Sequence, residues 1–198
     1  MRHFGCKMNL SQLTLFEPRE SLPEGFQYQP ELLTEDEERE LIDRFHDLPF
    51  KEFEFHGFLG KRRVVSFGWK YDFNTGKLQG SDPIPEFILP IRKKAAAFAA
   101  IELQSLVHVL VTEYSPGTAI GWHKDRPYYE DVIGISLASD CVFRLRRKAG
   151  SSWQRRSITL APRSVYALRG PVRNDWEHSI PAVARLRYSI TFRNLRVR

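Results

Sequence analysis

The last quarter of the chain alternates strictly between hydrophobic and polar positions. From Arg187 to Arg193, hydrophobic residues occupy every second position and polar residues fill the others. This period of two, with β-branched and aromatic residues, predicts a β-strand with one face suited to a core. The two arginines stand six positions apart, so they point to the same polar face. That face is either a solvated surface or, if it is buried, a place where each guanidinium needs an anionic partner.

Similar short hydrophobic runs fill the second half of the chain, separated by turns rich in Gly, Pro, Ser and Asp. The expected strands span residues 106–114, 131–138, 141–147, 154–160, 164–168, 177–181 and 185–193. Seven or eight short strands at this spacing predict a sandwich or a jelly roll.

Two helices are expected before these strands. Thr34 and Glu37 have the spacing of a capping box, and a hydrophobic stripe continues from there until Pro49 ends the helix. A second helical period runs from about residue 83 to residue 102. The sequence therefore predicts a mainly-β α+β fold whose N-terminal helices pack on one sheet.

Residues 1–30 contain several helix breakers and no clear period, so we expect an N-terminal arm followed by one domain at 31–198. Within the arm, Gln12–Phe16 resembles the short pentapeptide with which bacterial replication and repair proteins dock on the sliding clamp. A segment of this kind can become ordered on binding. The alternative is an edge segment that packs its hydrophobic residues on the domain.

Composition fits a globular protein of 198 residues, with 42% hydrophobic and 27% charged residues. No apolar run approaches the length of a membrane span, and no signal-peptide core opens the chain, so we expect a cytoplasmic monomer without a membrane partner. Cys6 and Cys141 are the only cysteines, which fits a reducing compartment. The net charge of +6 permits a polyanionic partner such as nucleic acid.

Three residues have the chemistry of an iron site. His123 and Asp125 lie two positions apart, on one side of an extended segment, and His178 follows two or three hairpins later. In a jelly roll this separation can return the chain to a neighbouring strand. Two histidines and one carboxylate form the facial triad of mononuclear non-haem Fe(II). Each histidine alone is more commonly an ordinary polar residue; the combination with Arg187 and Arg193, which need a dianion, favours an oxygenase.

Five blocks together resemble the AlkB family of 2-oxoglutarate- and Fe(II)-dependent dioxygenases: Tyr114–Gly117, Gly121–Asp125, Leu160–Ser164, Trp176–His178 and Arg187–Arg193. The similarity covers about residues 60–195. It implies a double-stranded β-helix with an N-terminal helical layer and a mobile nucleotide-recognition lid at about residues 53–75.

The resemblance also implies roles for individual residues. His123, Asp125 and His178 would be the iron ligands. The residues expected to hold 2-oxoglutarate are Arg187, Arg193, Tyr114, Thr112 and Ser189. Thr112 and Ser189 stand where the family often has Asn. Those expected to contact the substrate are Trp69 and Tyr71 of the lid with Arg62, Arg63 and Arg126. The alternative for residues 50–75 is a sheet with its aromatic face in the core and its basic side chains in solvent.

The implied activity is oxidative demethylation of alkylated bases in DNA or RNA, as in nucleic acid repair. Hydroxylation of a modified tRNA base or of a protein side chain is the alternative, and a β-helix binding module with a vestigial site is a third. The founding bacterial demethylase has an acid two residues after its ligand Asp, whereas this chain has Pro127 beside Arg126. Its base preference therefore does not carry over.

Overall fold

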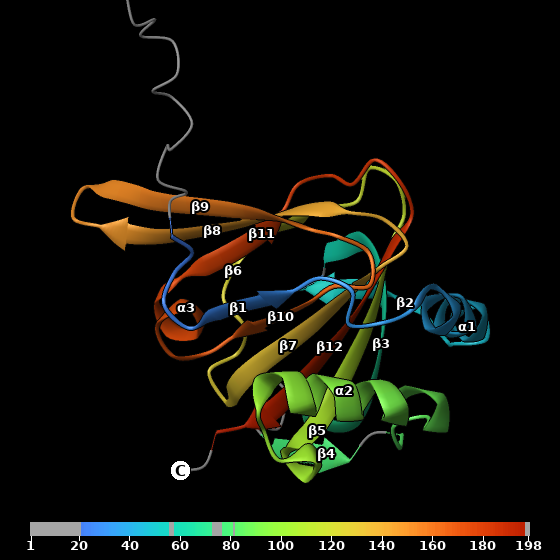
Figure 1. Cartoon of the computed structure of the whole chain (residues 1–198). Helices are drawn as coiled ribbons and strands as arrows, with labels where there is room; N and C mark the ends of the chain where they lie inside the picture. The colour runs from blue at the N-terminus through green and yellow to red at the C-terminus, as the bar shows by residue number, and fades with distance from the viewer. Residues whose placement is uncertain (1–20, 56–57, 73–76, 81, 197–198) are drawn as a thin grey trace, which may run out of the picture.

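Two antiparallel β-sheets face each other in the computed structural model, which describes residues 21–55, 58–72, 77–80 and 82–196 (Figure 1). The large sheet has the strand order β1-β10-β7-β12-β5-β3-β2, with β4 paired to β3, and the small sheet has the order β6-β11-β8-β9. The strands are β1 (Phe26–Gln29), β2 (Lys51–Phe55), β3 (Phe58–Asp72), β4 (Lys77–Gly80), β5 (Leu106–Tyr114), β6 (Ile120–His123), β7 (Tyr129–Leu137), β8 (Cys141–Ala149), β9 (Ser152–Leu160), β10 (Val165–Leu168), β11 (Glu177–Ile180) and β12 (Arg187–Leu195). The mainly-β jelly-roll prediction is confirmed.

β12 lies in the middle of the large sheet, between β5 and β7. Its register sets Arg187 opposite Tyr114, and Ser189 opposite both Thr112 and Ser136. The hydrophobic positions of β12 pack into a core with the helices, so the polar positions point to the other side of the sheet, towards the small sheet.

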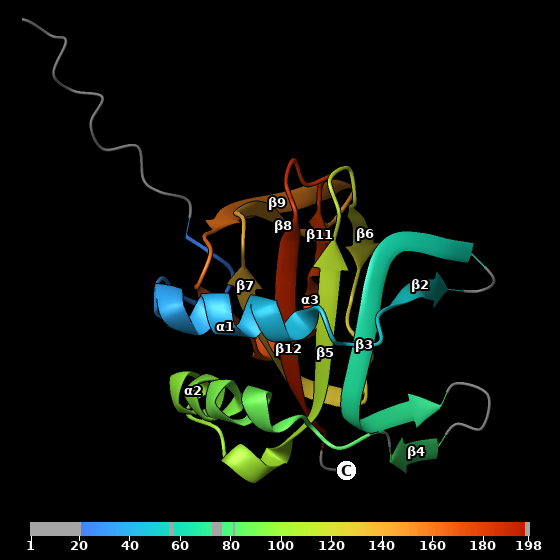
Figure 2. The ribbon, with the colours of Figure 1, turned by 90° about the vertical axis from the view of Figure 1, so that its right-hand side faces the viewer.

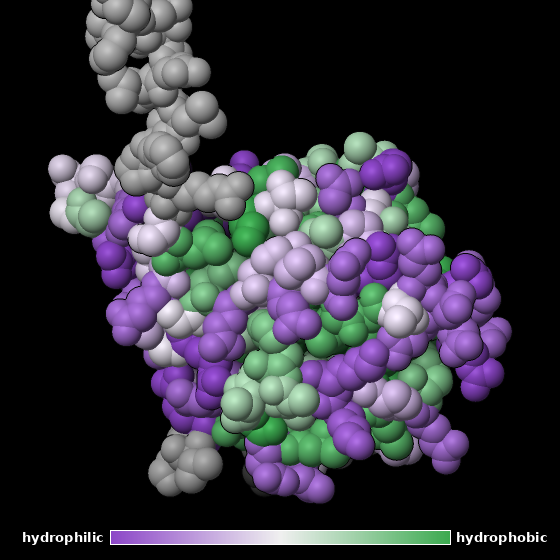
Figure 3. Space-filling view, in the orientation of Figure 1, coloured by the Kyte–Doolittle hydropathy of each residue, from purple (hydrophilic) through white to green (hydrophobic). Residues whose placement is uncertain are grey.

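Helices α1 (Glu35–Phe45) and α2 (Leu89–Ala99) cover the outer face of the large sheet (Figure 2). The capping box at the start of α1 is confirmed: the Thr34 hydroxyl accepts from the Glu37 backbone, and the Glu37 carboxylate accepts from the Thr34 backbone. α2 is shorter than the predicted 83–102, because a 3₁₀ turn (Glu86–Ile88) precedes it and Ala100 ends it in the left-handed region. Hydrophilic residues cover α1, at the right of Figure 3.

A second core fills the space between the two sheets. It contains Phe143 and Leu145 from the small sheet with Tyr114 and Tyr166 from the large one. The short helix α3 (Gly170–Asp175), which joins β10 to β11, contributes Val172 to it. This inter-sheet space therefore receives both the hydrophobic residues of the small sheet and the polar face of β12.

The predicted arm overlaps the domain. Phe26–Gln29 forms β1, which pairs with β10 at the edge of the large sheet, so this stretch is an integral strand. The predicted clamp-binding motif Gln12–Phe16 lies outside the described residues. No helix in the described ranges is long and apolar enough to cross a membrane.

The segment expected to form a lid, residues 53–75, falls on β2 and β3 in the described residues, and β4 follows it. β3 pairs with β5 up to Gly68 and with β4 from Trp69 onward, so it leaves the large sheet at this point. Gly68 has a φ of +84°, and a Cβ there would meet the Val107 carbonyl oxygen at 2.1 Å. Glycine is therefore required where β3 bends.

Candidate functional site

Two histidines meet on the inner face of the small sheet. His123 at the end of β6 and His178 in β11 are register partners, and their ring centroids lie 4.2 Å apart. His178 also stacks on Phe143 of β8, with centroids 5.2 Å apart. The two histidines, 55 positions apart in the sequence, thus become neighbours because β6 and β11 pair.

Asp125, two residues after β6, lies beside them in the same space. Its Oδ1 accepts hydrogen bonds from Nε and Nη2 of Arg193 at 3.1 and 2.9 Å. Its Oδ2 lies 3.6 Å from Nε2 of His178. The structure therefore brings together four of the five side chains predicted to form the centre: His123, Asp125, His178 and Arg193.

The hydrogen bonding and charge around the three candidate ligands suit a cation. Nδ1 of His123 donates to the Gly121 carbonyl oxygen at 2.9 Å, because a carbonyl can only accept, so Nε2 is the ring nitrogen that remains for a metal. Burial lowers the pKa of His178 to about 3, which keeps that ring neutral. Burial alone would raise the pKa of Asp125, but Arg193 and the other basic neighbours together outweigh burial and hold this pKa well below its ordinary value.

As the side chains stand, no three His, Cys, Asp or Glu groups in the described ranges converge at the spacing that would hold a metal ion. Asp125 is turned towards Arg193 and His178 instead. The donor chemistry nevertheless fits a divalent metal that accepts imidazole and carboxylate ligands.

Arg187 is fully buried in the same inter-sheet space, at 1% exposure. Its Nε and Nη2 donate to the Ser136 hydroxyl at 3.3 and 3.1 Å, and its guanidinium carbon lies 4.8 Å from the centre of the Tyr114 ring. Its Nη1 is buried without a hydrogen-bond partner. An unsatisfied buried guanidinium nitrogen is costly, and a carboxylate is the group that would satisfy it. Thr112 and Ser189, both buried, lie on the same face of the sheet.

Arg173 of α3 fixes the chain that follows Asp125. Its Nη2 donates to the carbonyl oxygens of Arg126 and Tyr129 at 2.5 and 3.0 Å. These two bonds hold the loop between β6 and β7 against α3. Sequence reasoning missed this residue, because α3 is too short to show a helical period.

Tyr166 is a second residue of the site that the sequence analysis missed. It lies opposite Gly134, and a Cβ on that glycine would come within 2.2 Å of the Tyr166 ring. The ring therefore lies flat across β7, close to the charges of Arg187 and Asp125. Burial raises the pKa of its hydroxyl, so the group is a hydrogen-bond donor at neutral pH. The fully buried run of β10 has no alternation that could have indicated its direction.

The residues predicted to contact substrate separate into two groups. Arg62 lies over the Phe53 ring at 3.7 Å, and its pKa, lowered by burial, also responds to Tyr114, Arg193 and Asp125, so it borders the site. Arg63 points to the opposite face of β3 and donates to both oxygens of Glu113 at 2.7 and 2.8 Å. Adjacent residues of a strand alternate, so only one of the pair can face the site.

Three other predicted contacts are peripheral. Trp69 is 48% exposed, on the part of β3 that pairs with β4. The side chain of Tyr71 lies outside what the structure describes. Arg126 is exposed in the loop after Asp125, with its carbonyl held by Arg173.

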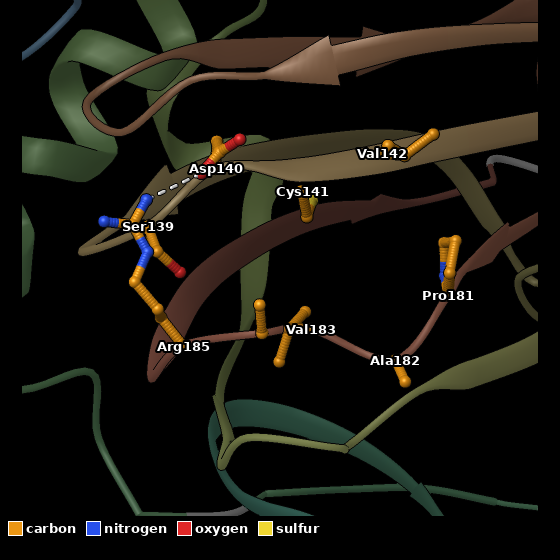
Figure 4. Close-up of a pocket in the computed structure, with 9 residues that line it drawn as sticks. Ser139, Asp140, Cys141, Val142, Pro181, Ala182, Val183 and Arg185 are labelled. Carbon is orange, nitrogen blue, oxygen red and sulfur yellow. Dashed lines mark hydrogen bonds and ion pairs between the residues drawn. The ribbon is translucent and has the colours of Figure 1, made fainter.

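A surface hollow of about 170 Å³ opens at the end of the sheets, between the β7–β8 turn and the β11–β12 loop (Figure 4). Its wall includes the ion pair between Arg185 and Asp140, at 3.0 Å, and the buried Cys141. Burial raises the pKa of the Cys141 thiol, so it is a poor nucleophile. None of the candidate iron ligands lines this hollow, although Cys141 in its wall interacts with Arg187 of the site.

Comparison with known proteins identifies a family. The sequence profile of the 2OG-Fe(II) oxygenase superfamily matches residues 25–193. The chain is 29% identical over 147 residues to an "Alkylated DNA repair protein ALKBH8 homolog" of Arabidopsis thaliana, covering 62% of this chain and 42% of that protein. It is 25% identical over 170 residues to the mouse "tRNA (carboxymethyluridine(34)-5-O)-methyltransferase ALKBH8", covering 81% of this chain and 25% of that one.

The solved structure of OsALKBH1 superposes with a TM-score of 0.68 at 18% identity, covering 89% of this chain and all of that one, which shows the shared fold. The matched regions span less than half the length of each curated relative named above.

Proposed function

Because the chain belongs to the 2OG-Fe(II) oxygenase superfamily and is AlkB-like, we propose that it removes N-linked methyl groups from alkylated nucleobases in nucleic acid repair. With 2-oxoglutarate as co-substrate, O₂ would be the oxidant of this reaction, and Fe(II) held at the site would activate it. One oxygen atom enters a methyl C–H bond of the base and the other leaves in succinate, with release of CO₂. The resulting hemiaminal then breaks its C–N bond and releases formaldehyde.

The unsatisfied Nη1 of Arg187 is the observation that carries the proposal. A buried guanidinium beside the Tyr114 ring, with one free N–H edge, fits the distal carboxylate of 2-oxoglutarate. The buried hydroxyls of Thr112 and Ser189 line the same subsite. We assign this carboxylate to Arg187 alone, because Arg193 is already engaged with Asp125.

His123, Asp125 and His178 would hold the metal. The His178 ring is neutral and the Asp125 carboxylate is ionised at neutral pH, which is the state that coordination requires, and the bond from Nδ1 of His123 to Gly121 leaves Nε2 of that ring for the metal. Three protein ligands leave coordination positions for the co-substrates. Arg193 orients Asp125, and Arg173 holds the loop that carries it.

Arg62 is the strongest candidate for a contact with the substrate, since it borders the site and carries a charge that suits a phosphate. Because the target base must reach the space between the sheets, it must leave its stack or arrive in a single strand. The name of the mouse relative refers to a carboxymethyluridine of tRNA, so hydroxylation of a modified tRNA base is the second candidate function.

The test is mass spectrometry of N-methylated DNA, N-methylated RNA and modified tRNA after incubation with iron-loaded protein, 2-oxoglutarate and O₂. Demethylation removes one methylene, whereas hydroxylation adds one oxygen atom. His178→Ala should abolish either change, and His46→Ala, at an exposed histidine next to α1, should retain it. If the protein binds iron and 2-oxoglutarate but changes none of these polymers, the proposed substrate class is wrong.

A further inference from the structure

The outer face of the small sheet carries a basic and aromatic surface. Residues that alternate with the site residues on the same strands form it: Arg144, Arg146 and Lys148 of β8, Trp153 and Arg155 of β9, Trp122 of β6 and Glu177 of β11. Glu177 is the only acidic residue of these four strands. The helices α1 and α2 pack on the large sheet, and the hairpin β8–β9 projects at the upper left of Figure 1.

The tryptophans hold the cations in place. Arg146 lies over Trp122 at 4.4 Å and over Trp153 at 4.2 Å, while Arg144 covers Trp122 at 5.2 Å and Lys148 covers Trp153 at 5.0 Å. Each indole thus already has two cations against its ring, which compete with a stacked base for the same ring. The surface presents positioned positive charge, which suits phosphates more than bases.

The surface adjoins the site through shared strands. Trp122 precedes His123, and Glu177 precedes His178, so each pair points to opposite faces of the small sheet. β6 is one of the two edge strands of that sheet. A polymer whose reacting base enters beside His123 can therefore cross this edge and continue along the outer face.

We propose that the outer face of the small sheet binds the sugar–phosphate backbone of the nucleic acid substrate, outside the reacting nucleotide and without regard to base sequence. This inference rests on the proposed function, because the polymer is the substrate of the same site. Lys148 and Arg155, which are exposed, bind phosphates, while Arg146 is held by the two indoles and by Glu177.

The test is a charge-reversal pair, Lys148→Glu with Arg155→Glu, compared with Arg39→Glu and Lys93→Glu on the helical side. Both double variants change the net charge equally, at exposed positions. Fluorescence anisotropy measures their affinity for a methylated oligonucleotide at several salt concentrations. The outer-face variant should bind about tenfold more weakly, with the slope of log K against log salt smaller by about 0.7 to 0.9 for each phosphate that the variant no longer binds. The affinity should fall equally for different base sequences.

Binding of 2-oxoglutarate to the metal-loaded protein should be unchanged in both variants. The surface proposal is overturned if the parent protein binds oligonucleotides and the outer-face variant has the same affinity as the parent or as the helical-side control. The proposed function then still stands. If the parent binds 2-oxoglutarate but no nucleic acid, both proposals fall. A fall in affinity that depends on base sequence would also contradict binding to the backbone.

Discussion

Arg193 donates two hydrogen bonds to a single oxygen of Asp125, so a buried cation of the large sheet holds a carboxylate that follows the edge strand of the small one. The pair joins β12 to the loop after β6. The two arginines of β12 therefore differ in role. Arg193 positions the Asp125 carboxylate, whereas Nη1 of Arg187 has no hydrogen-bond partner.

Replacing Arg193 by Met should destabilise the protein by about 3 to 5 kcal/mol, because the buried Asp125 carboxylate loses its main counter-charge. Urea unfolding at neutral pH measures this. The double variant Asp125→Asn with Arg193→Met should lose clearly less than the two single variants together. Additive losses would mean that the two side chains are not coupled.

Replacing Arg187 by Met should weaken 2-oxoglutarate binding by about a hundredfold or more, because the ligand loses a buried, charged hydrogen-bond partner. Isothermal titration of the metal-loaded protein checks this. Urea stability should hold or improve, since the substitution removes an incompletely satisfied buried charge. Arg185→Met is the matched control: its ion pair with Asp140 lies at the surface, and 2-oxoglutarate affinity should not change.

Glu113 should make stability depend on pH. The hydrogen bond from Arg63, aided by one from Tyr188, lowers the pKa of this carboxyl group. A carboxylate with a lowered folded-state pKa stabilises the fold above its unfolded pKa, about 4.3, and this contribution disappears as the pH falls through the lower folded value. On acidification, the free energy of unfolding should therefore fall by about 1 kcal/mol more in the parent than in Glu113→Gln. The value is small because Arg63 is half exposed.

Urea unfolding at neutral and acidic pH measures the effect. Glu40→Gln, at an exposed acid of α1, should follow the parent. Equal pH dependence in the Glu113 variant and the parent would contradict the role of this carboxyl.

Gly134→Ala should destabilise the fold by about 1 to 3 kcal/mol, because the added methyl group meets the Tyr166 ring. Thermal unfolding measures the loss. The double variant Gly134→Ala with Tyr166→Leu should recover part of it, since the smaller side chain leaves room for the methyl. If the double variant is no more stable than the alanine variant, the clash is not the cause.

Patterned strands and spaced motifs made much of this architecture predictable. The alternation of β12 and the capping box at Thr34 rest on local physics, and both are found as expected. β1 was missed because its four residues lie among prolines and gain their place only by pairing with β10. Long-range pairing of this kind leaves no local signal.

For the candidate site, the sequence could indicate which residues to consider but not which contacts they make. Nothing in the sequence separates Arg187 from Arg193; only the positions of Ser136 and Asp125 do so. Arg173 binds backbone carbonyl oxygens, and the Tyr166 ring occupies the space that a Cβ at Gly134 would need. Neither contact has a sequence motif. The alternation of β3, in contrast, could have excluded Arg63 once Arg62 was assigned to the site.

The alternation of β12 between the two faces of its sheet limits how this chain can vary in length. Inserting or deleting one residue inside 187–193 would exchange the two faces of the strand beyond that point, placing aliphatic and aromatic groups between the sheets and a guanidinium against the helices. Changes of length in this strand must therefore occur in pairs or at its ends, whereas the loops before and after it are free of that restriction.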